Sequence, residues 1–169
     1  DNSTLNLGSA DVEGLADVTG GSFTTTGNFA AGSITASGTQ LTIGGDMTSD
    51  GAATLTNTAT TVQNVATGDL TVTGGSLTAA SITGGNTTVS GGAVVTSAGA
   101  NTLDKLTASG SEMTMGATTI AGDMDLTGGS YAFDSLAVAG NADFTDVSGT
   151  LTKGDSSFGT ITVEGTSNA

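Results

Sequence analysis

Short pairs of apolar residues, two positions apart and punctuated by glycines, recur along the whole chain and constrain its fold more than any other feature. Leu70 with Val72 and Met113 with Met115 are two such pairs. This spacing places both members of a pair on one face of a strand, while the Thr between them faces water. Helical spacing is not sustained anywhere, and glycine and β-branched residues disfavour helices. The sequence therefore predicts an all-β protein.

The apolar pairs repeat with a longer period as well. Cutting the chain after the glycines that follow each alternation gives eight segments of roughly 20 residues, which is a period typical of solenoids. Segments 39–68 and 86–110 are longer, and we expect them to carry insertions within their coils. The prediction is a single domain, 1–169, folded as a parallel β-helix (β-solenoid) of about eight irregular coils.

A β-sandwich is the alternative architecture, because short strands at close spacing also permit two antiparallel sheets. The chain has five Phe, one Tyr and no Trp, which is little large-side-chain volume for a thick two-sheet core. A thin solenoid can be filled by Ala, Val, Leu, Ile and Thr. The lack of Pro favours uninterrupted ladders, because Pro removes a ladder donor. Both observations favour the solenoid.

The composition excludes most enzyme classes. Without Cys or His, the chain cannot build the common nucleophile systems or a zinc site with thiolate or imidazole ligands. Paired carboxylates can hydrolyse glycosides, but one Tyr and two basic residues offer little to hold a sugar. We therefore expect a protein that is not an enzyme and needs no organic cofactor.

The charge and hydropathy patterns limit the partners. The net charge of -14 repels phosphate backbones and anionic lipid surfaces, so a nucleic-acid partner is not expected. No run of about 18 apolar residues occurs, so insertion into a membrane is not expected either. The acidic groups keep neighbouring molecules apart in solution.

Two pairs of acids are candidate calcium ligands. Asp46 and Asp50 flank a loop within GGDMTSDG, and Asp123 and Asp125 share one strand face. Calcium is a hard cation that prefers carboxylate and carbonyl oxygens. However, neither the calcium nonapeptide of β-helices nor a DxDxDG loop is present. Solvated strand and turn acids are the alternative interpretation.

The two ends of the chain lack recognisable caps. An uncapped solenoid exposes unpaired backbone groups and apolar core at each end, where another copy can stack. Neither DNSTLNL nor TITVEGTSNA contains a strong cap. We therefore expect a homopolymer whose junction contacts include Leu5, Leu7, Ile161 and Val163.

The phrases GDLTVTGGSLTAASITGG and TTIAGDMDLTGGSYAFDSLAVAGNADF resemble the coils of secreted bacterial parallel β-helices, such as filamentous-haemagglutinin-like adhesins and autotransporter passengers. They also look like repeats of phage tail-fibre proteins. The similarity covers most of the chain, but it lies in the glycine-punctuated repeat pattern and not in a specific motif. No functional residue can therefore be assigned from it. The resemblance implies an extracellular structural or adhesive role.

Two functional hypotheses follow. The first is an exported, self-assembling subunit of a filament, sheath or surface layer, located outside the cell or on its surface. Zero Cys and the start at Asp1 without Met fit a processed, exported product, although a cloned fragment would begin in the same way. The second is an adhesin or phage-fibre fragment that binds a surface carbohydrate through TATTVQNVATG or SAGANTLDKLTASG.

Overall fold

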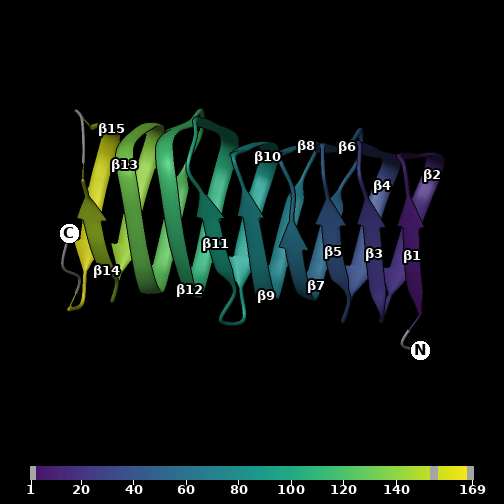
Figure 1. The fold of residues 1–169 in the computed structure, drawn as a ribbon. Coiled ribbons are helices and arrows are strands. Elements are labelled where there is room, and N and C mark those ends of the chain that lie inside the picture. Colours follow the sequence, from purple (N-terminus) through teal and green to yellow (C-terminus); the bar gives the residue numbers. More distant parts are fainter. Residues whose placement is uncertain (1–2, 153–155, 167–169) are drawn as a thin grey trace.

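The chain winds into a parallel β-solenoid of about nine turns, seen from the side in Figure 1, in a computed structural model that describes residues 3–152 and 156–166. The described residues contain no helix, and so none that could cross a membrane. Neighbouring coils pair in parallel throughout the sheet. The predicted all-β solenoid is therefore confirmed, whereas a sandwich would require antiparallel pairs.

Fifteen strands make up the described coils. Their bounds are β1 Thr4–Leu7, β2 Ala10–Thr19, β3 Ser22–Thr25, β4 Phe29–Ser37, β5 Gln40–Ile43, β6 Asp46–Ser49, β7 Ala53–Thr61, β8 Asn64–Thr67, β9 Leu70–Ala79, β10 Ser81–Ser90, β11 Val94–Ser97, β12 Asn101–Ile120, β13 Met124–Thr145, β14 Ser148–Leu151 and β15 Ser157–Glu164.

Each coil contributes a strand segment to each of three faces. The first face holds β1, β3, β5, β11 and β14 with the matching parts of β7, β9, β12 and β13. The second face begins with the start of β2 and includes β6 and β8. The third face begins with the end of β2 and finishes with the end of β15. Paired residues are 17 to 20 positions apart, as in Ala53 with Leu70 and Ala137 with Ser157.

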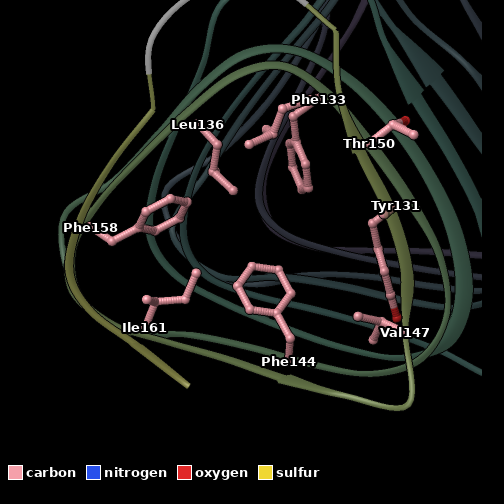
Figure 2. Close-up of a pocket in the computed structure, with 10 residues that line it drawn as sticks. Tyr131, Phe133, Leu136, Phe144, Val147, Thr150, Phe158 and Ile161 are labelled. Atoms are coloured by element: carbon pink, nitrogen blue, oxygen red, sulfur yellow. The ribbon is translucent and has the colours of Figure 1, made fainter. Parts of the chain in front are cut away.

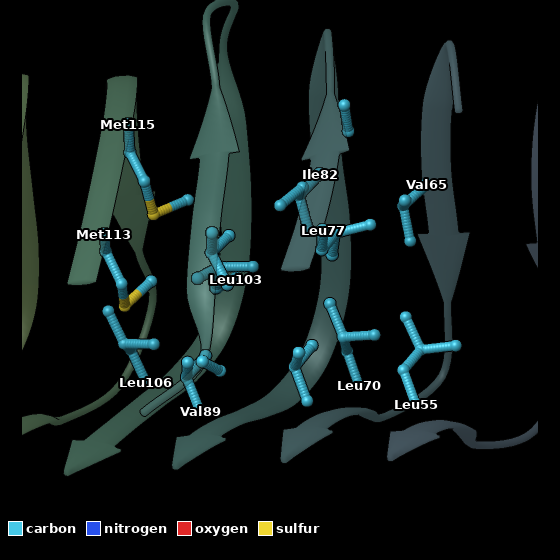
Figure 3. Close-up of a cluster of buried hydrophobic side chains, with 14 of the residues drawn as sticks. Leu55, Val65, Leu70, Leu77, Ile82, Val89, Leu103, Leu106, Met113 and Met115 are labelled. Carbon is cyan, nitrogen blue, oxygen red and sulfur yellow. The ribbon is translucent and has the colours of Figure 1, made fainter. Parts of the chain in front are cut away.

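The core is a column of side chains that runs through the middle of the coils. Alternate residues of each strand point inward and stack on the equivalent residue of the next coil, as Leu77, Val95 and Met113 do on the first face. Figure 3 shows this column in the central coils, with Leu, Val, Ile and Met directed between the strands. The period-two apolar pairs of the sequence are these inward-facing residues.

One corner of the solenoid requires left-handed backbone in every coil. All positive-φ residues of the described chain lie at this corner, between the third and first faces: Gly20, Gly21, Gly38, Asn57, Gly74, Gly75, Gly91, Gly92, Gly110, Gly128, Gly129, Asp146 and Gly165. Glycine adopts this conformation without steric cost, and Asn and Asp are the side chains that tolerate it best. The glycine punctuation of the sequence therefore has a geometric cause.

The number of coils differs from the expectation by one. Residues 39–110 form four regular coils, whereas the segmentation divided them into three of uneven length. The stretches 39–68 and 86–110 lie within coils whose partners are 17 to 19 positions apart, such as Gln40 with Ala59 and Thr83 with Thr102. Their extra length is therefore taken up by the additional coil.

Candidate assembly surfaces at the two ends

Five of the six exposed large apolar side chains of the described residues lie at the ends of the solenoid, and the sixth, Val94, lies in a central coil. Leu5 is 51% exposed in the first coil, while Leu151 is 49% exposed and Ile161 and Val163 are each 51% exposed in the last. All four occupy inward-facing positions, because they pair with core residues: Phe23, Phe133, Ala142 and Phe144, in that order. They therefore belong to the core column, and no further coil covers them within residues 3–152 and 156–166; we call these four side chains the exposed core rungs.

The N-terminal end is a hollow bounded by the first two coils. Its apolar lining includes Leu5, Leu7, Leu15 and Phe23. Leu7 is partly buried and packs against the core, whereas Leu15 is 58% exposed. The predicted contacts Leu5 and Leu7 thus lie together at this end.

The C-terminal end is a second hollow, and Figure 2 shows its lining directed into the space that the last coils enclose. Phe133, Phe144, Phe158 and Ile161 surround it. This aromatic lining makes the C-terminal hollow predominantly apolar. The predicted contact Ile161 borders the hollow itself, and Val163 follows two residues later on the same inward-facing side.

Tyr131 also lines the C-terminal hollow and is 2% exposed. Its burial raises the pKa of the phenol above the ordinary value of 10.0, and the negative charge of Asp125 adds to this. The backbone of Ser111 acts in the opposite direction and lowers the pKa. The phenol therefore loses its proton only at a pH more alkaline than an exposed tyrosine requires.

The backbone at the two ends is complementary. Among the strands that the structure describes, β1 and β2 pair toward the C-terminal side, with β3 and β4, whereas β14 and β15 both pair back onto β13. Each end thus presents the free edge of parallel strands. Free edges are templates for further pairing, and here one end offers the start of a coil stack and the other its finish.

The first predicted acid pair is separated in the fold. Asp46 begins β6, and its Oδ1 accepts a hydrogen bond from Nδ2 of Asn64 at 2.8 Å. Asp50 follows the end of β6, so the length of that strand lies between the two carboxylates. The side chain of Asn28 caps the arrangement by accepting the backbone N–H of Asp46 at 3.0 Å. Asp46 thus belongs to a ladder of polar side chains along one edge of the second face.

The second acid pair lies on the outer side of the third face. Oδ1 of Asp123 accepts the backbone N–H of Asn141 at 2.9 Å, and Oδ1 of Asp125 accepts the hydroxyl of Thr127 at 3.4 Å. Asp125 also borders a shallow depression that Asp143 and Glu164 line. Within residues 3–152 and 156–166, no three acidic side chains are arranged so that they could hold a metal ion. Calcium binding stays a prediction.

The segments expected to bind carbohydrate are part of the regular coils. TATTVQNVATG spans the end of β7 and the whole of β8, and SAGANTLDKLTASG runs from the end of β11 into β12. Neither forms a long projecting loop.

Sequence reasoning missed one residue of the C-terminal end and one feature of the surface. Leu151 is exposed at an inward-facing position, and its spacing of 18 residues from Phe133 was the available signal. The surface feature is the alignment of outward-facing threonines on the third face, which depends on the register between coils. A known period alone does not give that register.

Comparison with known proteins returns no match: no family model, no curated protein and no solved structure is significantly similar to this chain.

Proposed function

We propose that the chain is an exported structural subunit that assembles head to tail into an extracellular filament, sheath or surface layer. The observation that carries this proposal is the exposure of inward-facing core rungs at both ends, with Leu5 at one end and Ile161 and Val163 at the other. Stacking the last coil of one copy on the first coil of the next buries these side chains and continues the ladders.

The polarity of the coils determines the kind of assembly. The two ends are different surfaces, so each junction is heterologous, and heterologous contacts that do not close into a ring grow as open filaments. The role of such a filament is mechanical, because backbone ladders that continue through the junctions resist bending and breakage.

The acidic surface sets the conditions for assembly. A net charge of -14 makes copies repel one another, and added salt screens exposed charges beyond about 8 Å at physiological ionic strength. We therefore expect filaments to form more readily as ionic strength rises, while the acidic sides of finished filaments limit bundling.

Two blocked variants test the head-to-tail geometry directly. Leu5→Asp places a charge at the N-terminal end and leaves the C-terminal end intact, and Ile161→Asp does the reverse. Each variant alone should stay monomeric, whereas an equimolar mixture should form dimers and stop there, because only one pair of intact ends is present. Sedimentation velocity measures the species formed.

Val94→Asp is the matched control, because Val94 is 41% exposed but lies on the outside of the first face. This variant should polymerise like the unmodified chain. Dimers formed by Leu5→Asp alone would mean that two C-terminal ends bind each other, which would contradict head-to-tail assembly. An unmodified chain that stays monomeric at all concentrations and ionic strengths would refute the proposal.

A further inference from the structure

Two outward-facing rows of hydroxyl side chains run side by side across five consecutive coils of the third face. The first row consists of Thr35, Thr54, Thr71, Thr88 and Thr107, each paired with the next. The second row lies two residues further along each strand and consists of Ser37, Thr56, Thr73, Ser90 and Ser109. We call these ten residues the threonine array.

The threonine array forms a nearly rectangular grid. Neighbouring strands are about 4.8 Å apart and alternate residues of one strand about 6.7 Å apart. Hexagonal ice repeats its oxygen atoms along two perpendicular directions of a prism face, and each grid spacing lies within about a tenth of one of these repeats. A rigid grid of this kind can hold water molecules at positions that continue the ice lattice.

The chemistry of the array suits ordered water. Each hydroxyl both donates and accepts hydrogen bonds, and the β-branched carbon of threonine restricts its rotamers. Among the hydrogen bonds of the described residues, the array contributes one internal contact, between the hydroxyls of Thr73 and Ser90 at 3.4 Å. The remaining hydroxyls are left for water, and the methyl groups between them cover the gaps.

The distribution of charge supports a neutral, crystalline ligand. No charged residue occurs in the array, although the chain carries a net charge of -14. The first row becomes acidic outside these five coils, with Asp17 before it and Asp125 and Asp143 after it, whereas the second row continues with Thr19 before it and Thr127 after it. Charged groups order their own hydration shells strongly, which disrupts an ice-like layer. The adjoining row contains Asp69 and Lys105, so the neutral grid is two rows wide.

The first face provides an internal comparison. One continuous outward row of six threonines runs along it: Thr24, Thr42, Thr61, Thr78, Thr96 and Thr114. The row beside it is irregular and includes Val94, so this face lacks a second row of hydroxyls.

We propose that the threonine array binds the surface of ice. This inference does not depend on assembly, because a single chain holds the complete array. Ice-binding is measured as inhibition of ice recrystallisation and as thermal hysteresis of the purified full chain, at concentrations below and above any assembly.

The test variant is Thr71→Asp with Thr88→Asp, which interrupts the grid. Asp125 and Asp143 occupy the same row in later coils, so the coil geometry accommodates aspartate there. The control is Thr78→Asp with Thr96→Asp, which adds the same charge to the single row of the first face. Circular dichroism and the thermal midpoint verify that both variants are folded. A second array variant, Thr71→Ser with Thr88→Ser, removes only methyl groups and preserves the fold if the aspartates do not.

The unmodified chain should inhibit recrystallisation, the array variants should lose most of that activity, and the first-face control should retain it. The inference is overturned if the unmodified chain leaves ice growth unchanged or if the two aspartate variants lose activity equally. Adsorption of the unmodified chain to crystalline chitin or cellulose without any effect on ice would also overturn it.

Discussion

Replacing Ile161 and Val163 by threonine should weaken the junction between copies without disturbing the coil. Threonine keeps the β-branched shape and the strand preference of both residues, so the last coil should still form. What is lost is apolar area that stacking on another copy would bury. The variant Ile161→Thr with Val163→Thr therefore isolates the contribution of the exposed core rungs.

The magnitude follows from the exposure of the two side chains. Each is 51% exposed, so about half of its burial remains to be gained at a junction. Full burial of such a side chain contributes about 1.5–3 kcal/mol, so each contributes about 1 kcal/mol at the junction. Threonine keeps one methyl group but places a hydroxyl in the junction, and desolvating an unpaired hydroxyl costs about 1–3 kcal/mol, so a total loss of about 2 kcal/mol weakens each junction roughly 30-fold. The critical concentration for filament formation, measured by light scattering and sedimentation, should rise by the same factor.

Val94→Thr is the matched control for this double variant. Val94 is exposed to a similar extent, but it faces outward in the middle of the rod, so its replacement should leave the critical concentration unchanged. If the double variant assembled at the same concentration as the control, the apolar ends would not drive assembly. The reasoning from exposed rungs would then be refuted.

Three further predictions concern the fold. Gly38 has a φ of 58°, and no atom lies within 4 Å of the position of an added Cβ. Gly38→Ala should therefore lower the thermal midpoint by a few degrees, through about 1 kcal/mol of backbone strain, while Gly38→Asn should lower it less. Equal midpoints for the two variants would contradict the left-handed conformation of this corner. Asn101 is buried, and its Oδ1 accepts the backbone N–H of Ile82 at 2.9 Å and the hydroxyl of Ser97 at 2.6 Å. Asn101→Ala should therefore lower the free energy of unfolding, measured in urea, by about 2–4 kcal/mol. A urea midpoint like that of the unmodified chain would contradict this. The raised pKa of Tyr131 means that the unfolded chain loses its phenolic proton at a lower pH than the folded chain, so stability should fall as pH rises above about 10, and should fall less in Tyr131→Phe. Because the chain has one Tyr, an absorbance titration of the folded protein measures the pKa of this phenol directly. A titration midpoint at the ordinary pKa of 10.0 would contradict the prediction.

The fold class could be predicted from the sequence because period-two apolar pairs and glycine punctuation are local signals. The number of coils was harder, because one signal has two causes. Gly38 and Gly110 mark the left-handed corner, but Gly68 and Gly85 do not have positive φ and lie elsewhere in their coils. Dividing the sequence after glycines of both kinds therefore placed some segment boundaries at the left-handed corner and others elsewhere in the coil.

In two coils the left-handed corner position is occupied by a residue other than glycine. Asn57 and Asp146 adopt positive φ at this corner, with φ values of 50° and 53°. Because neither is a glycine, the segmentation passed over both positions. Treating Asn and Asp as possible corner residues at the same period would have predicted the regular coils.

The ends and the threonine array differ in how far sequence could reach them. The exposure of Leu5, Ile161 and Val163 in the described residues could be predicted, because these apolar residues lie in the first and last strands of the stack. The array was not predictable, because its alignment depends on register shifts between 17 and 19 residues per coil, as at Thr54 with Thr71 and Thr88 with Thr107. Such shifts are set by corner geometry and core packing together.

The axial repeat of the assembled protein tests the central claim most directly. Cryo-electron microscopy of filaments grown at moderate salt should show a strand spacing of about 4.8 Å that continues through each junction. The subunit repeat should be about 43 Å, which is the length of about nine coils at that spacing. Separate rods of that length, or filaments whose strand spacing is interrupted at every subunit, would contradict head-to-tail continuation of the solenoid.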